Sequence, residues 1–127
     1  MRAALNWLQA KCFLETEHLS VDLGHWWIAR EGDIPIAFAA LQPVPSWDQT
    51  AYMARSGVIH SHRGQGIQKR LLKRREQFAK QTGYVRIITS TYNNPASANS
   101  LIARGFRTYM PTAKWGAEDT IYWLKTL

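Results

Sequence analysis

The stretch that decides the fold reads VIHSHRGQGI and spans residues 58–67. Its first two residues are apolar, as at the end of a strand, and the apolar spacing from Ile67 onward predicts an amphipathic helix. Between them, Gly64 and Gly66 lack a Cβ atom, so the turn accepts unusual backbone angles and lets another molecule approach closely. The stretch therefore predicts a strand, a glycine-rich turn and a helix in direct succession.

The start of the helix at Ile67 makes this turn a candidate phosphate site. The first N–H groups of a helix have no partner within it, and the helix dipole adds roughly half a positive charge at the same end. We expect phosphate or pyrophosphate to bind there, with Lys69 and Arg70 within reach of a further phosphate. The alternative is a tight turn that binds nothing. No Gly-Lys-Ser/Thr follows the turn and the three-glycine fingerprint is absent, which excludes two familiar nucleotide-binding loops.

The rest of the chain places this turn at the centre of a mixed sheet. The elements expected from periodicity and turn residues are helices over residues 3–14, 67–81 and 95–104, a short helix within 15–22, and strands over 25–30, 34–41, 51–60, 85–91, 106–110 and 120–125. This order predicts an α/β (α+β) fold with a mixed central sheet and flanking helices. The 127 residues contain no repeat and no linker, so residues 1–127 are expected to form a single domain.

Charge is concentrated around the turn. The chain carries a formal net charge of +7, and residues 55–86 hold nine Lys/Arg and one acid, which leaves −1 for the remainder. Such a local excess favours an anionic partner at one place on the molecule. A nucleic acid, an acidic protein and a cofactor with several phosphates all satisfy this condition.

Composition excludes several classes of protein. With 46% hydrophobic and 20% charged residues, the chain is not disordered or of low complexity. No apolar run approaches the roughly 20 residues that span a bilayer, and the start lacks the apolar region of a secretory signal. The single cysteine, Cys12, cannot form an internal disulfide and suits a reducing cytoplasm. The histidines show no metal-ligand spacing, so no metal site is expected.

Two motifs in order resemble those of the GNAT superfamily of acyl-coenzyme A dependent N-acyltransferases. The family signature Gln/Arg-x-x-Gly-x-Gly/Ala corresponds to RGQGIQ at residues 63–68, with Gln68 departing from the usual Gly or Ala. A second segment, NPASANSLIARGF at residues 94–106, is similar to the later family motif that closes on Gly-Phe. The resemblance implies an enzyme that moves an acetyl group from acetyl-CoA to a primary amine.

The resemblance also implies how acetyl-CoA is held. Main-chain groups of Val58, Ile59 and His60 would bind the pantetheine arm in a slot between two splayed strands, and an N–H near Val58 or Ile59 would polarise the thioester carbonyl. Asn94 and Ser97 would contact the pantetheine or the phosphates from the far side of the slot. The pyrophosphate would be held by the turn and the start of the helix, chiefly through backbone N–H groups of Arg63, Gly64, Gln65, Gly66, Ile67 and Gln68.

The proton-transfer residues are less clear from the sequence. The tyrosine that the family often places four residues before the closing glycine is Leu101 here, and a strand position that holds glutamate in some members is Thr89. The remaining candidates are Tyr92, just beyond the strand 85–91, and His60, whose neutral imidazole is available near pH 7. The alternatives are that Tyr92 only packs at the end of the strand and that His60 only occupies a position in the turn.

Three further expectations concern the surroundings of the site. Trp47 and Trp115 lie in expected loops that rim the acceptor cleft in this fold, where they either contact substrate or have only a structural role. No strand precedes the first helix, so the sheet is expected to lack or shorten its first strand, and the exposed edge favours a homodimer. A nucleic-acid-binding module and a family member that binds CoA without catalysis remain the alternative functions.

Overall fold

The computed structural model describes residues 2–12 and 24–127. The elements in chain order are α1 (Arg2–Cys12), β1 (His25–Glu31), β2 (Ile34–Pro43), β3 (Thr50–Val58), the short 3-10 helix η1 (His60–His62), α2 (Ile67–Gln81), β4 (Arg86–Thr91), α3 (Pro95–Ala103), β5 (Arg107–Thr108) and β6 (Ile121–Thr126). The short helix expected within 15–22 lies outside the described residues. None of the helices described has the length and apolar character needed to cross a bilayer.

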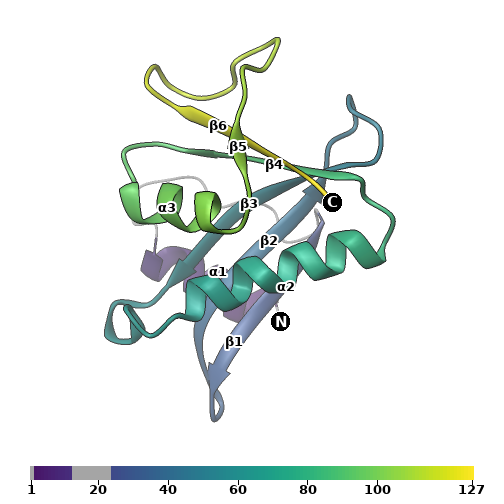
Figure 1. Ribbon diagram of the computed structural model, residues 1–127. Coiled ribbons are helices and arrows are strands. Elements are labelled where there is room, and N and C mark those ends of the chain that lie inside the picture. Colours follow the sequence, from purple (N-terminus) through teal and green to yellow (C-terminus); the bar gives the residue numbers. More distant parts are fainter. Residues whose placement is uncertain (1, 13–23) are drawn as a thin grey trace.

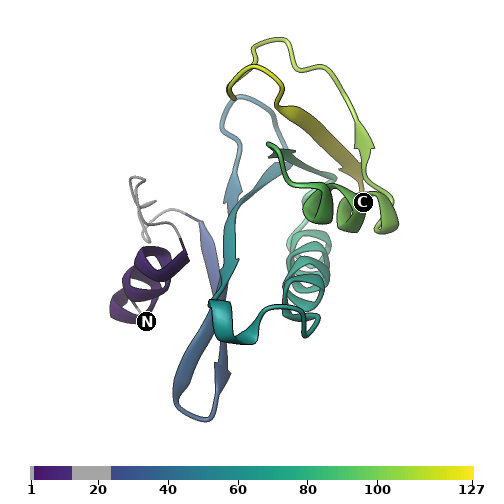
Figure 2. The same ribbon diagram turned by 90° about the vertical axis from the view of Figure 1, so that its left-hand side faces the viewer.

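One mixed sheet joins all the strands in the order β1-β2-β3-β4-β6-β5. Among the described strands only β3 and β4 run parallel, and α2 forms the crossover between them. Figures 1 and 2 show α1 on one face of the sheet and α2 and α3 on the other. Within the residues described, β1 forms an edge of the sheet. The expected mixed sheet with flanking helices is therefore confirmed.

Alternation along the strands builds a core on each face. On the α1 side, Leu5 and Leu8 of the helix pack with Trp26 and Phe38 of the sheet. On the α2 side, a larger cluster joins the two helices to the sheet through the residues Leu41, Ala51, Met53, Leu72, Ala79, Ile87, Leu101, Phe106 and Trp123. Trp26 and Trp123 are thus core residues on opposite faces of the sheet.

The two central strands separate soon after they begin to pair. Their parallel ladder runs from Thr50–Arg86 to Tyr52–Ile88 and then stops. Beyond that point the Thr89 hydroxyl donates to the Met53 carbonyl at 2.9 Å, which bridges the strands at the base of the fork. The sheet therefore opens between the carboxyl ends of β3 and β4, as the resemblance implied.

Two expected strands are shorter than predicted. β3 ends at Val58 rather than His60, because the His62 amide donates to Ile59 O and the Arg63 amide to His60 O, which closes a 3-10 turn. The strand expected over 106–110 reduces to Arg107–Thr108. The prediction of a strand at this place was correct, but the strand is shorter because the chain leaves the ladder to form the loop that follows.

Candidate functional site

The glycine turn has the conformation that its sequence predicts. Gly64 and Gly66 have φ values of +80° and +78°, in the left-handed region that favours glycine. A Cβ atom built on either glycine meets nothing within 4 Å, so space is open beside both. Gly66 is the N-cap of α2 and supplies no side chain, and the first helical hydrogen bond runs from Arg70 N to Gly66 O at 3.2 Å. The amides of residues 67–69 precede that bond and form the predicted anion-binding end.

Side chains on both flanks hold this turn in place. Arg63 Nε donates to Val58 O at 3.1 Å, which ties the turn back to the end of β3. His62 Nε2 lies 3.3 Å from Glu31 Oε2, and the other ring nitrogen lies 2.8 Å from Ser61 Oγ. The Arg63 side chain therefore positions the turn, which agrees with a signature that binds through backbone amides.

A cleft of about 350 Å³ runs from the start of α2 into the fork between β3 and β4. Two residues expected to bind the cofactor line it: Gln68 from α2 and Ser97 from α3. The other residues that line the cleft come from β3, β4 and the two helices, and they are Tyr52, Met53, Ala54, Arg55, Ser56, Leu72, Arg75, Thr89, Ser90, Thr91, Ala96, Ser100 and Leu101. The slot expected between splayed strands thus exists and faces α2 and α3.

The wall of this cleft contains a β-bulge. Opposite β2, the register passes from Ala39–Ser56 to Leu41–Met53, so β3 carries one residue more than its partner. The buried Arg75 of α2 spans the irregularity, with Nη1 3.3 Å from both Ala40 O and Ala54 O. Burial lowers the Arg75 pKa to about 10, which the neighbouring Glu76 opposes, so the guanidinium is charged at pH 7.

The amides expected to polarise the thioester carbonyl are placed differently by the structure. The Ile59 amide already donates to Ile36 O at 2.9 Å, and Val58 is buried against Leu71 in the core under α2. The residues of β3 that line the fork beyond Tyr52, residues 53–56, belong to the bulge. Sequence reasoning missed the bulge because strand register depends on the partner strand and leaves no local signal.

A second hollow follows the cleft along α2. It has a volume of about 310 Å³ and lies between α2 and α3, where Lys69, Arg70, Lys73 and Arg104 line it. Four cationic side chains in one hollow fit a phosphate group. Lys69 and Arg70 are therefore together, as expected for binding a further phosphate.

The two residues expected on the far side of the slot differ in role. Asn94 Oδ1 accepts from the Ser97 amide at 3.1 Å and caps α3, with Pro95 in the first turn. The Asn94 side chain is thus committed to the helix end, whereas Ser97 lines the cleft. This cap fixes where α3 begins and hence how it faces the fork.

The predicted catalytic residues lie at the margins of these cavities. Tyr92 follows β4 with 60% of its surface exposed, and His60 opens η1. Neither is among the described residues that line the cleft in the fork, the hollow or the aromatic cavity below. Their catalytic assignment remains a prediction.

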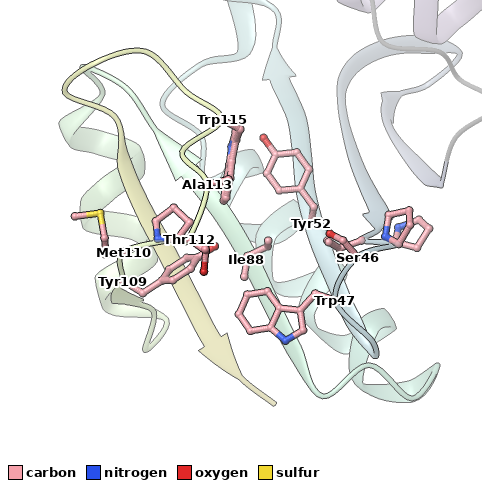
Figure 3. Close-up of a pocket in the computed structure, with 13 residues that line it drawn as sticks. Ser46, Trp47, Tyr52, Ile88, Tyr109, Met110, Thr112, Ala113 and Trp115 are labelled. Carbon is pink, nitrogen blue, oxygen red and sulfur yellow. The ribbon is translucent and has the colours of Figure 1, made fainter.

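On the opposite face of the sheet from α2, a cavity of about 670 Å³ opens beside the fork. Trp47 and Trp115 both line it, so the two loops expected to rim one cleft do meet. Figure 3 shows these two rings with Tyr52 and Tyr109 around Ile88. We call it the aromatic cavity; its lining residues are Pro43, Val44, Pro45, Ser46, Trp47, Tyr52, Ile88, Tyr109, Met110, Pro111, Thr112, Ala113 and Trp115.

Tyr52 joins the two cavities. It belongs to the last residue pair of the β3–β4 ladder and lines both the cleft in the fork and the aromatic cavity. Sequence reasoning missed Tyr52, because alternation along a strand shows which residues share a face and not where a strand parts from its neighbour.

Comparisons with known proteins agree with this geometry. The chain is 37% identical over 81 residues to N-acetyltransferase family 8 member 2 of Rattus norvegicus, a match that covers 61% of this chain and 36% of that protein. It is 28% identical over 126 residues to N-acetyltransferase 8B of Mus musculus, covering 89% of this chain and 54% of that protein. The chain therefore spans between about a third and a half of the length of these curated relatives.

A solved structure shows the same fold. The acetyltransferase of Bacillus subtilis, crystallised in complex with CoA, superposes with a TM-score of 0.78 at 19% identity, covering 100% of this chain and 93% of that chain. Residues 2–106 match the acetyltransferase (GNAT) family. This range includes the glycine turn, the fork and α3. The chain belongs to the acetyltransferase (GNAT) family.

Proposed function

We propose that the protein transfers an acetyl group from acetyl-CoA to a primary amine by direct transfer. One observation carries the proposal: a continuous cleft leads from the start of α2 to a fork in the sheet, and Tyr52 connects that fork with a second cavity on the other face. A donor and an acceptor can thus meet from opposite faces at one point. Family membership and the acetyltransferase names of the relatives support this assignment.

The residues present fit acetyl-CoA. The amides of residues 67–69 and the open glycine turn suit the pyrophosphate, and Lys69, Arg70 and Lys73 suit a further phosphate in the hollow between α2 and α3. The cleft in the fork suits the pantetheine arm. When bound, acetyl-CoA supplies an acetyl thioester whose carbonyl is open to attack by an amine.

The reacting atoms would meet at the fork. We assign the polarisation of the carbonyl oxygen, where negative charge develops during transfer, to a backbone amide of the bulge, residues 53–56. Tyr52 lines both cavities, and its hydroxyl is our candidate to hold a proton there. Tyr92 and His60 stay as candidates predicted from the sequence.

The test uses two independent measurements on the whole chain. Isothermal titration with acetyl-CoA should show saturable binding in the micromolar range, and thiol release from acetyl-CoA should depend on an added amine. Binding without amine-dependent release across a broad panel would instead show a family member that has lost catalysis. Absence of binding to the folded protein would overturn the proposal.

The alternative of nucleic-acid binding gains no support from the relatives described above. The excess of positive charge that motivated it lies largely on α2, where Lys69, Arg70 and Lys73 line the hollow beside the cofactor cleft. Binding to DNA or RNA that competes with acetyl-CoA and falls steeply with salt would favour that alternative.

The proposal includes a location and an oligomeric state. The lone Cys12 supports a reducing cytoplasm, and the unpaired side of β1 within the described sheet supports pairing of two copies through that edge. Sedimentation equilibrium should then give a mass that rises with concentration toward twice 14.6 kDa. A constant monomer mass up to high concentration would exclude the dimer.

A further inference from the structure

The aromatic cavity is apolar and carries no charge on its walls. Of the residues that line it in the described part of the chain, none is acidic, basic or a histidine. Its volume of about 670 Å³ lies within the range of cavities that bind small molecules. Any molecule that enters is therefore recognised mainly through apolar and aromatic contact.

Contacts between the rings make this wall a preformed surface. Tyr52 and Trp115 meet edge to face with centroids 6.1 Å apart, and Trp115 packs on Tyr122 at 4.5 Å. Tyr122 in turn contacts Tyr109 at 6.5 Å, and Tyr109 lies 6.2 Å from Trp47. Because these rings already support one another across two loops, little side-chain freedom is lost when a ligand binds.

Three backbone amides of the wall are engaged within the protein. The Val44 amide donates to Thr50 O, and the Trp47 amide donates to Val44 O. The Tyr109 amide donates to Tyr122 O. Three further lining residues have no N–H because they are prolines: Pro43, Pro45 and Pro111. These residues offer a ligand no free backbone N–H, whereas the buried Tyr109 hydroxyl has no hydrogen-bond partner in the described part of the chain.

One cation packs directly against this wall. The Arg86 guanidinium lies 4.8 Å from the centroid of Trp47, and its Nη1 is fixed by Thr50 Oγ1 at 2.7 Å and Asp48 O at 3.0 Å. A second ammonium group on the ligand would approach this cation, and no described residue that lines the cavity is acidic. The site therefore disfavours diamines and polyamines.

We propose, on the basis of the function proposed above, that the acceptor is a primary amine carried on an aromatic or apolar body that occupies the aromatic cavity. The amino group would point toward Tyr52, where the cavity reaches the fork. The amine nitrogen forms a bond to the acetyl carbon while the carbon–sulfur bond breaks. One proton leaves the nitrogen and one is gained by the sulfur, which yields an N-substituted acetamide and CoA.

The experiment compares primary amines that differ in the group that carries the amino nitrogen. Acetyl transfer is measured with 2-phenylethylamine, n-butylamine and 1,4-diaminobutane at saturating acetyl-CoA. We expect kcat/KM for 2-phenylethylamine to exceed that for 1,4-diaminobutane by about a hundredfold and that for n-butylamine by about tenfold. An equal or higher value for 1,4-diaminobutane would overturn the proposal.

Variants of the wall give a second readout. Trp47→Ala and Trp115→Leu should each lower kcat/KM for 2-phenylethylamine by about tenfold and change that for n-butylamine less than threefold. The control is Trp7→Ala, because Trp7 is 43% exposed on α1 and lies outside the aromatic cavity. Circular dichroism checks that each variant is folded. A similar loss for both amines in both wall variants would contradict the assigned contact.

Failure of this inference is distinguishable from failure of the proposed function. If acetyl-CoA binds and polar amines are the better acceptors, acetyl transfer stands and the acceptor class is wrong. If acetyl-CoA does not bind, both fail. If acetyl-CoA binds and no amine reacts, tryptophan fluorescence tests the cavity in the presence of CoA. Saturable quenching by 2-phenylethylamine that is lost in Trp47→Ala supports binding in the cavity. Absence of quenching overturns the inference.

Discussion

Arg75 Nη1 lies 3.3 Å from the carbonyl oxygen of Ala54, so a buried cation of α2 holds the bulged segment of β3. Residues of the bulge line the fork, where the acetyl group is proposed to lie. Arg75, which also lines the cleft, thus positions a backbone segment that we propose to meet the acetyl group.

Arg75→Met should therefore reduce activity more than it reduces stability. Removal of the guanidinium leaves the carbonyls of Ala40 and Ala54 without the Arg75 donor, but it also removes the cost of burying a charge. Because these two effects oppose each other, we expect the unfolding free energy to change by about 2 kcal/mol or less. The value of kcat should fall about tenfold or more while the Kd of acetyl-CoA changes little. The control is Arg74→Met, an exposed neighbour, and equal kcat values for the two variants would refute the positioning role.

Gly66→Glu should abolish binding of acetyl-CoA and leave the fold intact. The new side chain enters open space but puts a carboxylate where the pyrophosphate is expected, and its positive φ costs about 1–2 kcal/mol. Gly83→Glu is a matched control, since Gly83 also has a positive φ and open space but follows the other end of α2. Calorimetry should show a loss of binding of at least a hundredfold in the first variant only. Similar affinities in both would show that the turn does not hold the cofactor.

Tyr52→Phe keeps the ring that contacts Trp115 and removes only the hydroxyl of a residue that lines both cavities. We expect kcat to fall by about 10²-fold, with the KM for acetyl-CoA nearly unchanged. Tyr92→Phe and His60→Gln, compared in the same assay and over the same pH range, test the two residues predicted from the sequence. A large loss in either of these variants with none in Tyr52→Phe would return the proton-transfer role to that residue.

Glu76→Gln should destabilise the protein. The Glu76 carboxylate is nearly buried, accepts from Arg104 Nε at 2.6 Å and from Lys125 Nζ, and so ties α2 to α3 and β6. Its loss leaves two cations without a counter-charge, which we expect to cost about 2–4 kcal/mol. Urea unfolding measures the change, with the exposed Gln77→Ala as a control. A cost below about 0.5 kcal/mol would mean that the ion pairs of Glu76 contribute little to stability.

Cys12 should react slowly in the folded protein. Burial raises the pKa of its thiol, while the charge of Arg63 lowers it to a smaller extent. A raised pKa means that the folded state holds the proton more tightly, so this group contributes stability at neutral pH that is lost as pH rises through its folded pKa. At pH 8, alkylation by iodoacetamide should be slower than in urea. Equal rates would show that the thiol is not shielded.

The glycine turn, the helix that follows it and the second motif could be predicted because their signals are local. Positive φ at Gly64 and Gly66 requires glycine, and the apolar face of α2 repeats at helical spacing. The cap of α3 by Asn94 likewise depends on residues that are three positions apart. Such features follow from the chain itself.

Other features depended on contacts between distant segments. The register of β3 against β2 creates the bulge, and residues 36 positions apart, Met53 and Thr89, meet at the fork. The aromatic cavity forms only when the loop around Trp47 meets the loop around Trp115. The sequence alone thus determined the glycine turn and the family, whereas the junction at Tyr52 and the aromatic cavity were decided by tertiary structure. The reason is that strand register and loop packing are set by distant partners, which local periodicity does not encode.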